Sequence, residues 1–111
     1  MIRRKPLKAL RSPTVIDVAW AAGIYEGEGC VSSSKGSIKV GVTQKDPWLL
    51  VKLLMLFGGR IYKYKTRPIF EWHLSGPRSK GFLFTIFTFL SPRRRRQIEA
   101  ALRRGNPEPV S

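Results

Sequence analysis

Ala21-Ala22-Gly23-Ile24-Tyr25-Glu26-Gly27-Glu28-Gly29 is the stretch that decides the fold. It begins with a helical pattern and ends on two carboxylates framed by glycines. Gly23 and Gly27 are four residues apart, so they lie on one face of the predicted helix and leave that face almost flat. A flat face allows the backbone of a second helix to approach closely.

Glu26 and Glu28 fall where this helix should end, near its negative pole. An acid at that place is unfavourable by about 0.3–1 kcal/mol. A bound cation, held by a carboxylate and the last unpaired helix carbonyls, would compensate for this effect. Alternatively, both acids are exposed to water and the glycines only end the helix. The residues of this stretch leave both interpretations open.

Composition points to a globular protein with a polyanionic partner. The chain has 111 residues, enough for one domain with a core, and 42% of them are hydrophobic. Its formal net charge is +14, from 21 Lys+Arg against 7 Asp+Glu. Such an excess predicts nucleic acid first and an anionic membrane surface second. The single cysteine, Cys30, excludes an intrachain disulfide and is expected in the core.

We expect one domain over residues 12–104, a basic arm over residues 1–11 and a flexible tail over residues 105–111. The start of the chain is basic and has no apolar segment, so it does not read as a secretory signal. It could be a short organellar targeting segment, but a flexible basic arm fits better. No apolar run is long enough to span a membrane. We therefore expect a cytoplasmic protein of a bacterium, archaeon or phage, or an organellar protein, without a membrane partner.

Four X-Pro steps predict four helix starts, because each pairs a residue suited to the N-cap with a proline suited to the first helical position. The predicted helices run from Pro13 to Gly27, from Pro47 to the Gly58-Gly59 pair, from Pro77 to Leu90 and from Pro92 to Arg104. The third is rich in aromatic and β-branched residues, which would also suit a buried strand. Its Gly-Pro start and its length favour a helix.

Two hairpins are predicted between these helices, with strands over residues 30–33 and 37–44, and over residues 60–65 and 69–75. The element order is helix, two strands, helix, two strands, helix, helix. This order predicts an α+β fold in which helices cover one face of a four-stranded antiparallel sheet. From the alternation we expect a polar and mainly basic open face that carries Ser37, Lys39, Thr43, Lys63, Lys65, Glu71 and His73. The alternative is an ordinary solvated sheet face.

The segment Ala22 to Gly29 resembles the signature of the LAGLIDADG homing endonucleases. The element order αββαββα, the proline-led helices and the Val42-Thr43-Gln44 strand ending are also similar to that family. The similarity extends from about Ile16 to Leu102. Single-motif members are homodimers whose signature helices pack against each other and whose sheets form a saddle on the DNA major groove. The resemblance thus implies a dimer interface at Ala19, Ala22, Gly23, Glu26 and Gly27, with Glu26 in a mainly structural part.

The resemblance also implies the catalytic residues. Glu28, with the backbone carbonyl of Gly27, would bind the divalent metal, usually Mg²⁺, for which Ca²⁺ or Mn²⁺ can substitute. Gln44 would position water near the metal. Arg93 would lie near the scissile phosphate, with Arg94 as the second candidate and a further DNA contact. No small-molecule cofactor is implied.

Phosphodiester hydrolysis explains why a dimer is expected. One chain supplies only one well-placed acid, Glu28, and two metals near a shared phosphate can activate water and stabilise the leaving oxygen. Twofold symmetry predicts a long pseudo-palindromic target and cleavage of both strands. The sequence departs from the family pattern at three places. Both signature acids, Glu26 and Glu28, are Glu where Asp is commoner, and Ala21 stands where Leu is usual. Trp48 stands where a second basic active-site residue often occurs.

Two other functions are compatible with the composition. One is a LAGLIDADG-like protein that binds DNA or RNA without cutting it, as a maturase or regulator would. The other is an RNA- or ribosome-associated structural protein, which explains the charge and predicts a monomer. The second alternative gives no reason for a flat glycine face that leads into two acids.

Overall fold

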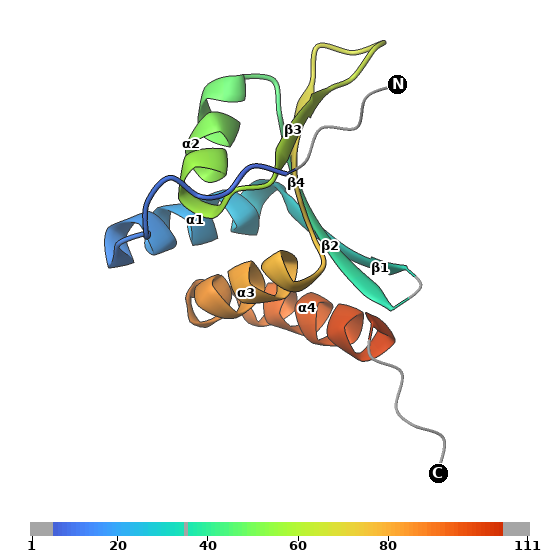
Figure 1. The fold of residues 1–111 in the computed structure, drawn as a ribbon. Helices are drawn as coiled ribbons and strands as arrows, with labels where there is room; N and C mark the ends of the chain where they lie inside the picture. Colours follow the sequence, from blue (N-terminus) through green and yellow to red (C-terminus); the bar gives the residue numbers. More distant parts are fainter. Residues whose placement is uncertain (1–5, 35, 106–111) are drawn as a thin grey trace.

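The computed structural model describes residues 6–34 and 36–105, which form two layers (Figure 1). The elements follow the predicted order: α1 Val15–Glu28, β1 Gly29–Ser34, β2 Ser37–Gln44, α2 Pro47–Phe57, β3 Arg60–Lys63, β4 Phe70–Ser75, α3 Pro77–Ile86, a 3₁₀ turn Phe87–Phe89 and α4 Pro92–Gly105. The strands form one antiparallel sheet in the order β1-β2-β4-β3. The helices lie on one side of it. The predicted α+β architecture is confirmed.

Helix starts agree with the proline signals at three of the four places. Asp46 caps α2 by accepting the Trp48 N–H at 2.9 Å. The first helix, however, begins at Val15 rather than at Pro13, because Thr14 is its N-cap and forms a reciprocal capping box with Asp17. The aromatic segment after Gly76 is helical, as predicted, but it tightens into a 3₁₀ turn after Ile86.

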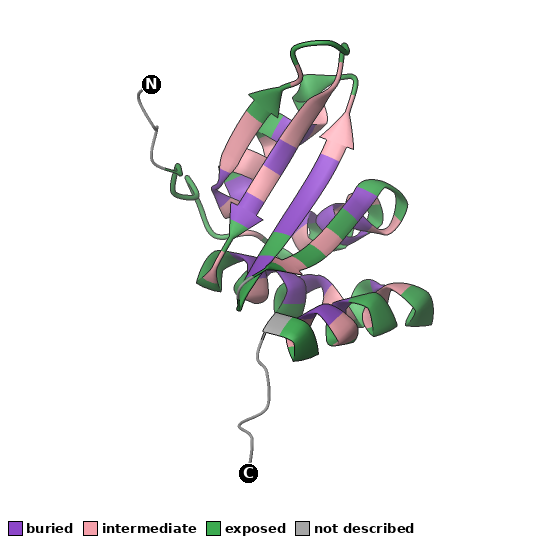
Figure 2. Ribbon diagram, turned by 90° about the vertical axis from the view of Figure 1, so that its right-hand side faces the viewer, coloured by how far each residue is buried: buried purple, intermediate pink, exposed green. Residues whose placement is uncertain are grey.

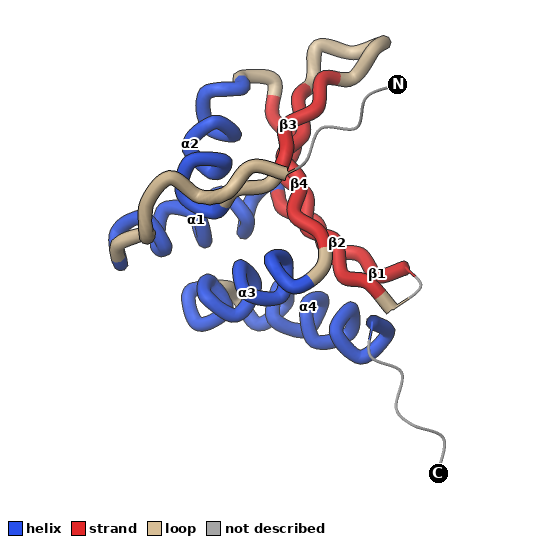
Figure 3. The backbone as a smooth tube through the Cα atoms, in the orientation of Figure 1, coloured by secondary structure: helices blue, strands red, loops and turns tan. Residues whose placement is uncertain are grey.

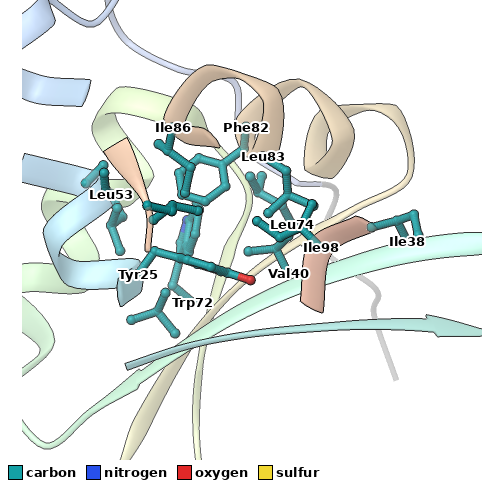
Figure 4. Packing of buried hydrophobic residues seen from close by; sticks show 14 of the residues in the cluster. Tyr25, Ile38, Val40, Leu53, Trp72, Leu74, Phe82, Leu83, Ile86 and Ile98 are labelled. Carbon is teal, nitrogen blue, oxygen red and sulfur yellow. The ribbon is translucent and has the colours of Figure 1, made fainter. Parts of the chain in front are cut away.

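The core lies between the sheet and the helices and is built around three aromatic rings (Figure 4). Tyr25, Trp72 and Phe82 are almost completely buried. The Trp72 and Phe82 rings meet edge to face with centroids 5.2 Å apart, and the Tyr25 and Phe82 centroids are 6.2 Å apart. The indole Nε1 donates to the Gly58 carbonyl at 2.9 Å, so the one polar atom of Trp72 is satisfied.

The strand register defines the two faces of the sheet. Ile61 is opposite Trp72, and both pack with the core, so this row faces the helices. The neighbouring rows therefore face away from the helices, because successive side chains alternate. One of these rows runs Cys30, Gly41, His73, Arg60 across all four strands, and the next contains Thr43, Glu71 and Tyr62. Figure 2 shows the alternation of buried, intermediate and exposed strand residues on this open face.

Two expectations about the faces are wrong, and a third residue lies outside the strands. Lys63 is opposite Phe70 and follows Tyr62, so it belongs to the helix side of the sheet rather than to the open face. Cys30 is exposed on the open face, because β1 begins with the buried Gly29 and not with Cys30. Lys65 lies in the exposed loop between β3 and β4, beyond the end of the ladder.

The segment before α1 is attached to the domain over the residues that the structure describes. Leu7 pairs with Gly59 through two backbone hydrogen bonds of 2.9 Å, and the Leu10 N–H donates to the Met55 carbonyl. Figure 3 shows this segment as a loop that runs from the sheet past α2 to the start of α1. Residues 1–5 of the expected basic arm and residues 106–111 of the expected tail lie outside the described residues. Among the described helices, none has the length and apolarity needed to cross a membrane.

Candidate functional site

The C-terminal end of α1 is joined to the start of α4 by a polar network around Glu26. The Glu26 carboxylate accepts the Ser91 backbone N–H at 2.7 Å and the Ser91 hydroxyl at 2.8 Å. These bonds, together with the positive charges of Arg94 and Arg93, lower the pKa of Glu26. Arg94 donates its Nε to the Glu26 carbonyl at 3.1 Å, so a cation from α4 satisfies the negative end of α1.

Arg94 is therefore held within the protein. Only 11% of its side chain is exposed, and its guanidinium lies over the Tyr25 ring at 5.4 Å. Arg93, the first candidate near the phosphates, is exposed, and its charge acts on the Glu26 carboxylate from the first turn of α4. Of the two arginines, Arg93 is the one whose side chain is available to a ligand.

Glu28 differs from Glu26 in its exposure and in its contacts. It is exposed, and no described residue forms a hydrogen bond or ion pair with its carboxylate. Gly29 pairs with Val42, so Glu28 and Gln44 lie at the same open end of the β1–β2 hairpin. Within residues 6–34 and 36–105 no three His, Cys, Asp or Glu side chains are grouped to hold a metal. One chain thus offers a single free carboxylate at this end of the helix.

The solvent face of α1 carries no charge along three turns. Val15 and Ile16 are 76% and 81% exposed, and Ala19, Gly23 and Gly27 continue the same face. A methyl group added at Gly23 or Gly27 would meet no described atom within 4 Å beyond the adjoining backbone of its own helix. An uncharged helix face open to water is unusual in a chain with a net charge of +14.

Ala22 does not belong to this face, which corrects the expectation from the sequence. It is 2% exposed and packs in the core with Ala21 and Tyr25. The reason is geometric, because adjacent helical residues are 100° apart and Gly23 already faces the solvent. Glu26 lies at the border of the exposed face, where Ser91 and Arg94 engage it.

The open face of the sheet combines basic, aromatic and acidic groups. Lys39 and Ser37 are exposed, Thr43 is half-buried, and Glu71 and His73 lie in the two central rows. Arg60 and Tyr62 also lie there, although the expected position of Lys63 on the open face implies that Tyr62 faces the core. The signal was present, because Ile61 is the one aliphatic residue of β3 and marks its inward side.

A pocket of about 160 Å³ lies beside the β3 edge of this face. Two arginines and a histidine contribute to it, and its lining consists of Pro6, Gly59, Arg60, Tyr62, His73, Leu74, Ser75 and Arg78. Arg60 donates to the Tyr62 hydroxyl at 3.2 Å, whereas its buried Nε has no partner among the described residues. Such a cationic lining is suited to an anionic group.

Comparison with known proteins identifies the fold through structure. The sequence matches no known family profile and no curated protein. Among solved structures, the homing endonuclease I-CvuI in complex with DNA has a TM-score of 0.69 at 17% identity, over 79% of this chain and 64% of that one. The archaeal intron-encoded homing endonuclease I-Vdi141I, complexed with DNA, has a TM-score of 0.62 at 18% identity, over 80% and 65%. The homing endonuclease I-TnaI has a TM-score of 0.59 at 19% identity, over 78% and 69%.

The chain therefore matches less than two thirds of the length of the first two of these proteins. The resemblance inferred from the signature is confirmed at the level of the fold, since these structures share the α+β architecture with its four-stranded antiparallel sheet. The chain has the fold of the LAGLIDADG homing endonucleases.

Proposed function

We propose that the protein is a site-specific double-strand DNA endonuclease that acts as a homodimer on a long pseudo-palindromic target. The observation that carries the proposal is the uncharged, solvent-exposed face of α1, which leads directly to Glu28, whose carboxylate is exposed and has no partner among residues 6–34 and 36–105. A second copy packed on Gly23 and Gly27 would cover this face. It would also bring two Glu28 carboxylates together beneath the paired sheets.

The open sheet face supports DNA as the partner. Lys39, Arg60, Thr43 and His73 present donors on a surface that carries no helix. The pocket between Arg60 and Arg78 has the size and charge to take one phosphate of the DNA backbone. Base edges in the major groove would be read by the strand residues, whereas phosphates would be held by the arginines at the border.

The residues at the end of α1 fit a divalent cation. Mg²⁺ binds through one or two carboxylates and keeps several waters, so a single free Glu28 from each subunit is a suitable ligand set. The Gly27 carbonyl is the nearest backbone candidate, and Ca²⁺ or Mn²⁺ could occupy the same site. When bound, the metal would neutralise phosphate charge and lower the pKa of a coordinated water. Glu28 would fix the metal, Gln44 would orient water, and Arg93 would bind the cleaved phosphate.

The test is cleavage of DNA carrying the sequence that flanks the gene, with Mg²⁺ present. Wild-type protein is expected to cut both strands. Glu28→Gln is expected to retain DNA binding and lose cleavage, because it keeps the size of the side chain and removes the charge. Glu99→Gln, which removes an exposed acid from α4, is the matched control and should cut normally. Equal cutting by Glu28→Gln and wild type would refute the assignment of Glu28.

A protein that binds DNA without cutting it is the second candidate. Trp48 favours it, because the side chain at this often basic position is 63% exposed and uncharged. This candidate keeps the charged sheet but does not require Glu28. The same assay separates the two functions: binding without cleavage by the wild type, at every divalent metal tried, would favour it.

A further inference from the structure

Glu71 is an acid in the middle of a face that should meet DNA. It is the only acidic residue in the four strands, and it lies in the central strand β4. Its carboxylate is engaged on both oxygens: Oε1 accepts the Tyr64 hydroxyl at 2.9 Å, and Oε2 lies 2.8 Å from His73 Nε2. Only 17% of the Glu71 side chain is exposed, so it is held in place.

Neighbouring residues fix this group further. The Tyr62 and His73 rings pack edge to face with centroids 5.0 Å apart. Gly41 lies opposite His73, and a methyl group there would come within 2.8 Å of Glu71 Oε2. The hydrogen bond to Glu71 raises the pKa of Tyr64, which keeps its hydroxyl a donor. The Glu71 carboxylate is therefore a preorganised hydrogen-bond acceptor rather than a mobile surface acid.

An acceptor in this position has a specific consequence for DNA recognition. A carboxylate repels phosphates and weakens binding to every sequence, unless a donor on the DNA meets it. The major groove offers such donors at the N4 amino group of cytosine and the N6 amino group of adenine. In adenine the neighbouring N7 is an acceptor and would face the carboxylate unfavourably. Cytosine has no acceptor on the major-groove edge, so it is the better partner.

We propose that Glu71, positioned by Tyr64 and His73, selects a cytosine at one base pair of each half-site. This inference rests on the proposed function, since it requires that the open face of the sheet lies in the major groove. A carboxylate has about four acceptor sites, and the two internal contacts leave others free for an incoming amino group. The expected discrimination against other bases is about tenfold to a hundredfold.

The experiment is a binding selection from a randomised double-stranded DNA library, with Ca²⁺ present, for wild type, Glu71→Gln and Glu99→Gln. Glu99→Gln removes the same charge from the exposed side of α4. The wild type and Glu99→Gln should share a motif with two symmetry-related positions restricted to cytosine. Glu71→Gln should lose that restriction at these positions alone and bind unselected DNA more tightly, because a negative charge is removed from the face.

Tyr64→Phe provides a second variant, which keeps the carboxylate and removes one of its two supports. It should retain the cytosine preference in weakened form, and circular dichroism would verify folding of each variant. An unchanged motif in Glu71→Gln, or in Tyr64→Phe if Glu71→Gln does not fold, overturns the inference while leaving the proposed function intact. If the wild type enriches no motif, sequence-specific binding itself is rejected, and the inference with it.

Discussion

Ser91 donates both its backbone N–H and its hydroxyl to the Glu26 carboxylate, at 2.7 and 2.8 Å. These two bonds connect residues that are 65 positions apart in the chain and lock α4 onto the end of α1. The signature contains two glutamates separated by one residue, and the structure separates their roles. Glu26 stabilises the fold, whereas the Glu28 carboxylate has no hydrogen-bond or ion-pair partner in the part of the chain that the structure describes.

The hydrogen-bonded carboxylates of Glu26 and Asp17 predict that the free energy of unfolding falls at low pH. The Ser91 N–H and hydroxyl lower the pKa of Glu26 below its ordinary value of 4.5, and the Arg11 hydrogen bond lowers the pKa of Asp17 from 3.8 to about 2. A carboxyl with a depressed folded-state pKa stabilises above its unfolded pKa, and this contribution is lost as pH falls through the folded value. The melting temperature should therefore fall as pH decreases below about 4.5 and continue to fall toward pH 2.

Glu26→Gln removes the contribution of Glu26 to this loss of stability and leaves that of Asp17. It should lower the melting temperature at pH 7 and flatten its pH dependence just below pH 4.5, where Glu26 would begin to take up a proton. Glu99→Gln, at an exposed acid without a partner among the described residues, should leave the profile unchanged. Identical pH profiles for Glu26→Gln and wild type in thermal melts would contradict the structural role of Glu26.

Arg93 and Arg94 are adjacent, but the structure predicts different effects of their substitution. Arg94→Ala removes the hydrogen bond to the Glu26 carbonyl and the contact with the Tyr25 ring, so it should destabilise the protein by about 1–3 kcal/mol. Arg93→Ala should change stability little. In the proposed mechanism Arg93 binds the cleaved phosphate, so its loss should reduce cleavage by at least about tenfold. Denaturant melts and single-turnover cleavage would separate the two effects. Destabilisation by Arg93→Ala together with loss of cleavage in a stable Arg94→Ala would contradict the roles assigned to the two arginines.

The element order could be predicted from the sequence because its signals are local. Pro47, Pro77 and Pro92 mark helix starts, and the Gly58-Gly59 pair ends a helix with positive φ angles of 75° and 106° that other residues rarely adopt. The first helix start was missed because the capping box at Thr14 follows a proline that reads as the stronger signal. Local chemistry therefore placed every helix and strand, with shifts of a few residues at their ends.

The assignment of residues to faces was less secure because it depends on partners that are distant in the chain. Ala22 and Gly23 are both small, and Ala22 is buried because it lies three residues before Tyr25, on the helix face that packs against Phe82. Tyr62 suits a core as well as a surface, so β3 could be read with either face inward. The pairing of Arg60 with His73 settles this register, and the sequence of β3 alone does not contain that information.

Lys39 and Lys63 test the corrected faces directly. Both are exposed lysines in strands, but Lys39 lies on the open face and Lys63 on the helix side. Lys39→Gln should weaken DNA binding and reduce the salt dependence of the affinity by about one unit of slope for each subunit. Lys63→Gln carries the same change of charge and should have a smaller effect on both. Binding titrations over a range of salt concentrations provide the measurement, and an equal or larger effect of Lys63→Gln would contradict the assigned register.

The glycines of the exposed α1 face predict opposite effects on folding and on assembly. Gly23→Ala should stabilise the folded monomer by about 0.5–1 kcal/mol, because alanine favours the helix and its methyl group would meet no described atom within 4 Å beyond the adjoining backbone of α1. In a dimer that packs on this face, the same methyl group would separate the two helices and weaken association. Gly81→Ala is the matched control, since this helical glycine of α3 is also exposed and also has space for a methyl group.

Sedimentation and thermal melts on the three proteins distinguish these contributions. Gly81→Ala should raise the melting temperature and leave the dimer intact, whereas Gly23→Ala should shift the protein toward monomer at micromolar concentration. Loss of the dimer should also abolish double-strand cleavage, since each monomer carries one Glu28. A wild-type protein that sediments only as a monomer, or a Gly23→Ala variant that dimerises as tightly as the wild type, would show that the α1 face is not the site of association. The uncharged surface from Val15 to Gly27 would then need a different partner.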